Sequence, residues 1–196
     1  ILAYMMYKKL FPAIRIVGLM LFVLFSQLVL AQNTKRIDDR DISYVTSGGK
    51  LHPLQKKMDI RQYTLALDID IPNRSISGYT EIKIQQLEKS DTILFDLIHL
   101  YLVNKVTVNN KAVAFAQQDD KVFITAQNGF EKGEKYVRIY YSGIPPVAVR
   151  PPWNGGFTWE KDKSGNDWVA INIQAEGGKM YFPCKDHPSD EPNEGV

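Results

Sequence analysis

Apolar and polar residues alternate along most of the chain after residue 58. In the segment 63–71, Tyr, Leu and Ile occupy every second position, while Thr64, Asp68 and Asp70 lie between them. A period of two places the apolar side chains on one face, which predicts a half-buried β-strand. The turn residues Pro72 and Asn73 follow, and the alternation resumes in the segment after them. The two segments therefore predict an antiparallel hairpin.

Further short segments rich in Val, Ile, Tyr, Thr and Phe follow, separated by Asn, Asp, Gly and Pro. The β-branched and aromatic residues in them favour strands. These segments are residues 92–98, 102–109, 121–126, 135–143, 156–160 and 167–174. No window after residue 31 sustains the period of a helix. The fold class predicted is therefore all-β, and frequent turns between short strands favour an antiparallel sandwich.

The first 58 residues lack the alternation. A basic stretch is followed there by an apolar run that ends at Ala31. This order, with small residues at its end, is typical of a secretory signal peptide, so residues 1–31 are predicted to be one. The run is also shorter than the ~20 residues of a membrane span, and we expect contact with a membrane only through this segment. Residues 32–58 are polar, without a period, and are expected to form a linker or arm.

Charge and cysteine content narrow the possible partners. The formal net charge is +2, and it falls to −1 without the predicted signal peptide, which holds three basic residues and no acidic one. Such a chain has no basic face for phosphate groups, so nucleic acid is not expected as a partner. The single cysteine cannot form an internal disulfide. We expect a soluble protein that is secreted across the inner membrane and is periplasmic or extracellular.

The stretch YFPCKDHPSDEP, residues 181–192, gathers residue types that carry chemistry. Cys184 and His187 could be half of a zinc site, or they could act as a thiol–imidazole pair. A closed zinc site needs four ligands. The His-Glu-x-x-His motif of zinc proteases is also missing from the sequence. Architecture is the favoured reading. Pro183 would stiffen the chain, Cys184 would fill a gap in the core, and Asp186 would brace the loop by accepting backbone N–H bonds. The other acids are expected to form a solvated charge run.

Asn172, Gln174 and Glu176 come just before this stretch. Two amides that alternate with apolar residues on a strand point to the same face. Amide side chains there can hold a ligand's amine or peptide group. An ordinary polar face of a sandwich strand is the alternative.

The segment QAEGGKMYFPCKDHPSDEP resembles the end of the N-terminal domain of zinc aminopeptidases of the aminopeptidase N family. Members carry Gln or Glu on a strand and, about ten residues later, Pro-Cys-x-Asp. Gln174 and the motif of Pro183, Cys184 and Asp186 match this pattern. The hairpin that starts near residue 59, Asp96 and the Gly-Phe segment at residue 156 also resemble the family. The resemblance covers residues 59–196.

The resemblance implies an open, saddle-shaped antiparallel β-sandwich that packs over a thermolysin-like catalytic domain, normally in cis. That catalytic domain would supply the zinc and the His-Glu-x-x-His motif. We therefore expect no cofactor and no metal ligand in this chain. We also expect it to be a truncated product, or one domain of a larger metallopeptidase, that is inactive as a hydrolase by itself.

By the same resemblance, Gln174 would bind the free α-amino group of peptide substrates. Asn172 would line the same pocket, and Glu176 is the second choice for the role. No residue is expected to be catalytic. Two other functions remain open: a free-standing β-sandwich carbohydrate-binding or adhesion module, with Trp153, Trp159 and Trp168 stacking on sugars, and a structural protein without a ligand.

Overall fold

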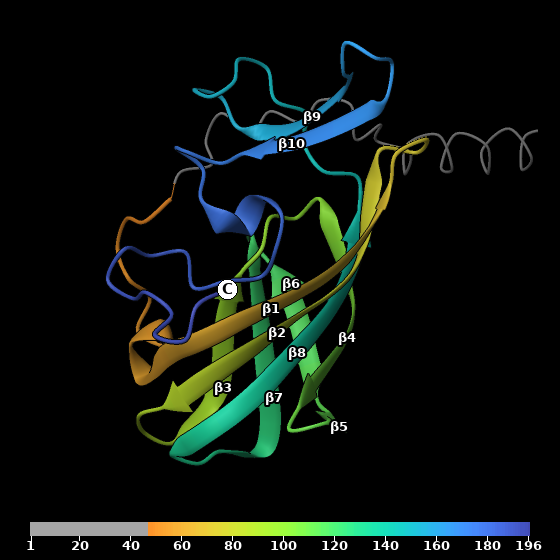
Figure 1. Ribbon diagram of the computed structural model, residues 1–196. Coiled ribbons are helices and arrows are strands. Elements are labelled where there is room, and N and C mark those ends of the chain that lie inside the picture. Colours follow the sequence, from red (N-terminus) through yellow and green to blue (C-terminus); the bar gives the residue numbers. More distant parts are fainter. Residues whose placement is uncertain (1–46) are drawn as a thin grey trace, which may run out of the picture. The chain divides into compact units, whose positions relative to one another are not determined.

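The computed structural model of the protein describes residues 47–196 (Figure 1). The predicted signal peptide and most of the predicted arm lie outside these residues. Almost all regular structure in the described range is antiparallel strand, which confirms the predicted all-β fold class. Among the described residues, no helix has the length and apolar character that a membrane crossing requires.

Ten strands and two short 3-10 helices follow one another in the described range. They are η1 (Gln55–Lys57), β1 (Met58–Asp70), β2 (Ser75–Gln86), β3 (Ser90–Asp96), β4 (Tyr101–Val108), β5 (Lys111–Ala112), β6 (Ala114–Gln118), β7 (Lys121–Phe130), β8 (Gly133–Gly143), β9 (Gly156–Lys161), β10 (Asp167–Asn172) and η2 (Gly178–Met180). The predicted hairpin is β1 and β2. The pattern missed β5 and β6, and it placed the end of β10 two residues too late.

The larger sheet has five antiparallel strands in the order β1-β2-β8-β4-β5. Its register aligns apolar side chains in rows across the strands. Ile82 on β2 lies opposite Val137 on β8, which in turn lies opposite Val108 on β4. Because opposed residues in antiparallel strands point to the same face, such rows form one continuous apolar surface.

A three-stranded sheet, in the order β3-β7-β6, packs against that surface. In Figure 1 the long strands β1, β2 and β8 cross in front of β3 and β7. Side chains from both sheets, such as Ile82, Ile139, Phe95 and Ile124, are fully buried in one core. Two sheets that face each other across a common core are a β-sandwich, as the sequence predicted.

Strands β9 and β10 form a separate two-stranded hairpin. Its tip is closed by Asp162, whose carboxylate accepts the backbone N–H groups of Ser164 and Asn166 and the side-chain amide of Asn166. These hydrogen bonds hold the pKa of Asp162 below its usual value, and the bond from the Asn166 side-chain amide has the largest effect. The base of the hairpin joins the main core through Phe157, which stacks on Trp159. The hairpin therefore leads directly into the segment that carries Asn172 and Gln174.

Candidate functional site

Gln174 is presented on a turn and not on a strand. Strand β10 ends at Asn172, which pairs with Gly156, and the Gly177 N–H then closes a turn by donating to the Ile173 carbonyl at 3.0 Å. The Gln174 side chain is exposed on this turn, and Asn172 is half-buried. The expectation that both amides share one strand face is therefore wrong, because the chain leaves the strand before it reaches Gln174. Their role in substrate binding stays a prediction.

Glu176 lies on the same turn but is turned inward. Its side chain is only 5% exposed, and Oε1 accepts the Gly155 backbone N–H at 2.9 Å. Oε2 is buried without a hydrogen-bond partner among the described residues. A Cβ at position 155 would lie 2.4 Å from the Asn172 carbonyl oxygen and 2.5 Å from Oε2, so only glycine fits there. Glu176 thus holds the loop before β9 against the turn that carries Gln174.

A second anchor fixes the other side of this turn. The Ser47 N–H donates to the Ala175 carbonyl at 2.9 Å, and the Ser47 hydroxyl donates to the Asp186 carboxylate. Asp186 also pairs with Lys179 at 3.0 Å. Its carboxylate therefore braces the loop through side chains, and the prediction that it accepts backbone N–H bonds is not what the structure shows. The turn at Gln174 is held from both directions.

Cys184 is part of the core. Its backbone N–H and carbonyl pair with those of Asp96 at 3.0 and 2.7 Å, which adds the chain at Cys184 to the edge of β3. The side chain is 4% exposed, and burial raises the pKa of the thiol well above its usual range. A thiol held protonated in this way is a poor nucleophile. The structure confirms that Cys184 fills a gap in the core, and the neighbouring Pro183 is buried as well.

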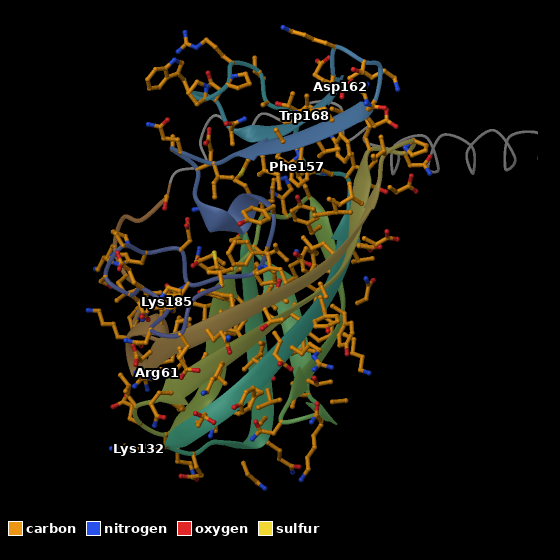
Figure 2. All side chains as sticks on the ribbon, in the orientation of Figure 1. Arg61, Lys132, Phe157, Asp162, Trp168 and Lys185 are labelled. Atoms are coloured by element: carbon orange, nitrogen blue, oxygen red, sulfur yellow. The ribbon has the colours of Figure 1, made fainter. Side chains whose placement is uncertain are left out.

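Asp190 is not part of a solvated run of acids, whereas Glu191 is exposed as expected. Lys185 donates through Nζ to the Met58 carbonyl at 2.8 Å and to Asp190 Oδ2 at 2.5 Å. Asp190 in turn accepts the Ile60 N–H at 3.2 Å. The two charged side chains are 5% and 6% exposed. Figure 2 shows Lys185 on the segment that runs beside β1. This edge strand has free backbone groups, and the charged pair supplies their partners.

The residues described here do not fit a zinc ion. The two ring nitrogens of His187 form hydrogen bonds with the Ser189 hydroxyl at 2.8 Å and the Gly49 carbonyl at 3.1 Å. The thiol of Cys184 is buried in the core. Within residues 47–196, no group of three or more His, Cys, Asp and Glu side chains could hold a metal ion. The zinc that the resemblance implies has no ligand set in this part of the chain.

The three tryptophans proposed for sugar stacking differ in exposure. Trp159 is 9% exposed and packs flat against Phe157, with ring centroids 5.5 Å apart. It offers no open face to a sugar. Trp153 and Trp168 remain exposed, and Figure 2 shows Trp168 on the hairpin. The structure therefore removes one of the three residues on which the carbohydrate-binding alternative rested.

Exposed apolar side chains occur in the loop before β9 and on β10. Most of them come from the loop, and two come from β10 itself. They are Ile144, Val147, Val149, Trp153, Trp168 and Ile171, each at least 38% exposed. Exposed apolar side chains can contribute to an interface where they form a contiguous patch. We call these six residues the hairpin surface.

Comparison with known proteins places this geometry in a family. Residues 60–191 match the family model described as the peptidase M1 N-terminal domain. Among solved structures, a two-domain M1 zinc metallopeptidase variant bound to L-arginine is 24% identical, with a TM-score of 0.51, and the match covers 69% of this chain and 31% of that one. Native leukotriene A4 hydrolase from Saccharomyces cerevisiae is 19% identical, with a TM-score of 0.57, over 84% and 26%. These likenesses show the fold, and this chain spans less than a third of the length of either structure.

Proposed function

Because the chain belongs to the family of peptidase M1 N-terminal domains, we propose that it is the substrate-capping domain of a secreted zinc aminopeptidase. Its catalytic partner would be a thermolysin-like domain in cis, which would hold the zinc and perform the hydrolysis of peptides. The predicted signal peptide supports an exported protein that acts in the periplasm or outside the cell. The residues described here bind and position the substrate and take no part in activating water.

The observation that carries this proposal is the exposed Gln174 on an anchored turn. Glu176 ties one side of the turn to Gly155, and Ser47 ties the other side at Ala175. A turn held twice fixes the backbone from which the Gln174 side chain projects, and such preorganisation reduces the entropy lost on binding. The amide oxygen can accept hydrogen bonds from an α-ammonium group. A free amino terminus is the group that distinguishes aminopeptidase substrates from internal peptide bonds.

The hairpin surface supports a neighbouring domain. Its apolar side chains lie on β10 and on the loop that Glu176 holds, next to the turn of Gln174. Covering this surface with a catalytic domain would remove apolar area from water and would place Gln174 at the boundary between the two domains. A residue at such a boundary can reach a substrate that the partner domain hydrolyses.

Substitution of Gln174 in the complete enzyme tests the proposal. Loss of a hydrogen bond to a charged group removes ~1.5–3 kcal/mol of binding, so Gln174→Ala should raise KM for a leucine anilide about 10-fold or more. The kcat should change much less, because the zinc site is untouched. Gln174→Glu should bind the ammonium at least as well as the wild type, since it keeps an acceptor and adds a negative charge.

A matched control is Gln118→Ala, an exposed glutamine on β6 in the three-stranded sheet, which should leave both constants unchanged. Steady-state kinetics with free and N-acetylated substrates gives the readout. An enzyme with Gln174→Ala that retains its wild-type KM and its preference for free amino termini would show that the residue has another role.

A further inference from the structure

A pocket with a volume of about 520 Å³ lies on the face of the five-stranded sheet that points away from the core. Its lining comes from β2, from the start of β8 and from the turn between β4 and β5. The lining residues are Glu81, Asn109, Asn110, Glu134, Tyr136 and Arg138. In Figure 1, β5 and the start of β8 lie at the end of the sandwich away from the hairpin of β9 and β10. The pocket is therefore separate from Gln174 and from the hairpin surface.

The strand register places these side chains on one face. Glu81 on β2 lies opposite Arg138 on β8. On β8, the lining takes every second residue from Glu134 to Arg138. The intervening Val137, like its partner Ile82 on β2, is fully buried in the core. Because side chains alternate between the two faces of a strand, the strand residues of the lining all point outward.

The charged groups of the lining are already paired. The Arg138 guanidinium lies 2.6 Å from Glu81 Oε2. The Glu134 carboxylate pairs at 3.4 Å with Lys83, which also contacts Glu194 from outside the lining. Each charged group of the lining thus has a counter-charge on the protein. A charged ligand would gain little from them and would still lose its own hydration, so the pocket suits an uncharged ligand.

Two asparagines keep hydrogen-bonding capacity for a ligand. Asn109 and Asn110 have φ angles of 49° and 64°, and such left-handed pairs form the tight turn of a hairpin. Asn109 Oδ1 accepts the Tyr136 N–H at 2.9 Å, which fixes the turn against β8. Within residues 47–196, the side-chain amide of Asn110 has no hydrogen-bond partner. This amide can donate and accept at the same time.

Tyr136 supplies the aromatic surface of the pocket. It is 42% exposed. Lys83 Nζ lies 6.0 Å from the centroid of its ring, but Lys83 does not line the pocket, so the cation leaves the ring open there. A tyrosine ring has an apolar body and a polar tip. The pocket thus combines a flat apolar surface with hydrogen-bond donors and acceptors around it.

We propose that this pocket binds an uncharged sugar unit of a glycan. The ring of Tyr136 packs against the face of the sugar ring that carries C–H groups. The sugar hydroxyls, which donate and accept, bond to the Asn110 amide and the Glu81 carboxylate. An apolar group would leave these polar atoms without partners, and that loss costs binding free energy.

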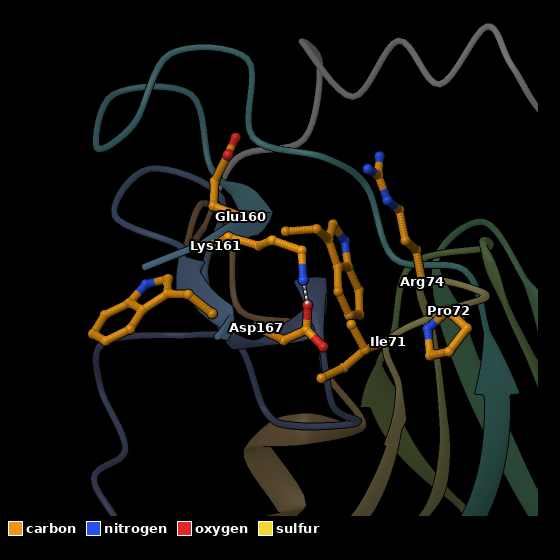
Figure 3. Close-up of a pocket in the computed structure, with 8 residues that line it drawn as sticks. Ile71, Pro72, Arg74, Glu160, Lys161 and Asp167 are labelled. Atoms are coloured by element: carbon orange, nitrogen blue, oxygen red, sulfur yellow. Dashed lines mark hydrogen bonds and ion pairs between the residues drawn. The ribbon is translucent and has the colours of Figure 1, made fainter. Parts of the chain in front are cut away.

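Another pocket, between the β1–β2 turn and the hairpin of β9 and β10, does not offer this combination (Figure 3). It has two tryptophans in its lining, but no amide side chain. In the register of the hairpin, Trp168 lies opposite Glu160, whereas Trp159 lies opposite Val169. Neighbouring positions on a strand point to opposite faces, so the two indoles do not form one surface.

Calorimetric titration of the full chain with maltotetraose, cellotetraose and chitotetraose tests the proposal. At least one of these uncharged oligosaccharides should bind with a Kd of about 1 mM or tighter. Tetragalacturonate, which carries a carboxylate on every ring, should bind about 10-fold more weakly than the best of them, because the lining has no unpaired cation for it.

Variants locate the binding. Tyr136→Ala removes the stacking surface and should weaken binding of the best oligosaccharide about 10-fold. Asn110→Gly removes the amide but keeps a residue that accepts a positive φ, and should weaken binding about 5-fold. The matched control is Asp119→Gly, in the β6–β7 turn, where φ is also positive at 49°. It lies outside the lining and should bind like the wild type, and circular dichroism would verify that all three variants fold.

Several results would overturn the proposal. One is the absence of binding by all three uncharged oligosaccharides at about 10 mM, well above a millimolar Kd. Another is tetragalacturonate binding as tightly as the best of them. A third is unchanged affinity in both folded variants. Loss of binding in Trp168→Ala but not in Tyr136→Ala would place the sugar at the other pocket. Dimers in sedimentation that Tyr136→Ala abolishes, without sugar binding, would show an interface between copies of the chain instead.

Discussion

At the scale of single residues, burial separates side chains that look alike in the sequence. Asp96 occupies the end of β3, where its Oδ2 accepts the Gln55 amide at 2.6 Å and the Asp186 N–H at 3.1 Å. Asp68 on β1 is exposed to solvent. Burial raises the pKa of Asp96 above its usual value of 3.8 in spite of the two hydrogen bonds. Desolvation of the charged form therefore outweighs the donors at this position.

This shift predicts how stability depends on pH. A carboxyl group with a raised pKa in the folded state contributes stability below its unfolded pKa, and that contribution is lost as the pH rises through the folded pKa. Asp96→Asn removes the ionisable group. The unfolding free energy of the variant should therefore increase relative to that of the wild type as the pH rises from below 3.8 towards neutrality. Urea denaturation at a series of pH values measures the difference. A difference that stays constant or falls with pH would contradict the predicted direction.

At the scale of elements, the close approach of β1 to β2 decides which residue type can occupy position 78 of β2. Gly78 lies within β2, opposite Leu67 on β1 and Tyr141 on β8. Its φ is +146°, and a Cβ there would lie 2.0 Å from the Ala66 carbonyl oxygen. The alternation of apolar residues predicted the strand and its partner. The need for glycine comes from the neighbouring backbone, which a single strand's pattern does not contain.

Gly78→Ala should accordingly destabilise the protein by about 3 kcal/mol, because either the β1 backbone must move or β2 must change its dihedral angles. Gly133→Ala is a matched control at the start of β8. Its φ is +127°, but no atom lies within 4 Å of a Cβ there. That substitution carries only the conformational strain of about 1 kcal/mol. Chemical denaturation of both variants gives the comparison. Equal losses in the two would mean that the contact with Ala66 is not what excludes a side chain.

At the scale of the described domain, the closing segment protects an edge of the larger sheet. Strand β1 is the edge strand, and residues 184–195 run beside it. The Glu194 N–H donates to the Arg61 carbonyl, and the Tyr63 N–H donates to the Gly195 carbonyl. The pair of Lys185 and Asp190 completes this contact from buried positions. An uncovered edge would offer free backbone groups to other chains, so this segment also guards against aggregation.

Removal of one member of the Lys185–Asp190 pair should strongly lower the unfolding free energy. Lys185→Met leaves the Asp190 carboxylate buried without its cation, which should lower the unfolding free energy by about 3–5 kcal/mol. Lys161→Met breaks the exposed pair with Asp167 on the hairpin and should cost less than about 1 kcal/mol. Thermal and urea unfolding of both variants give the two losses. Similar small losses in the two would show that the buried pair contributes no more than a surface pair.

Local alternation was enough to predict the sandwich, because the period of two is a property of neighbouring residues. It identified β1, β2 and β8, while the type and the aromatic neighbours of Cys184 indicated its place in the core. The alternation does not predict which groups the charged and turn residues contact. Lys185 contacts Met58 across 127 positions, and Asp190 was mistaken for a solvated acid for this reason.

Only the docking of distant segments decided which acids are buried, why Gly78 is required and where Gln174 leaves the strand. The pocket between the β1–β2 turn and the hairpin also arises only in the folded chain. Each of these features depends on backbone groups that meet after folding, whereas the pattern along the chain records only which face of a strand is apolar.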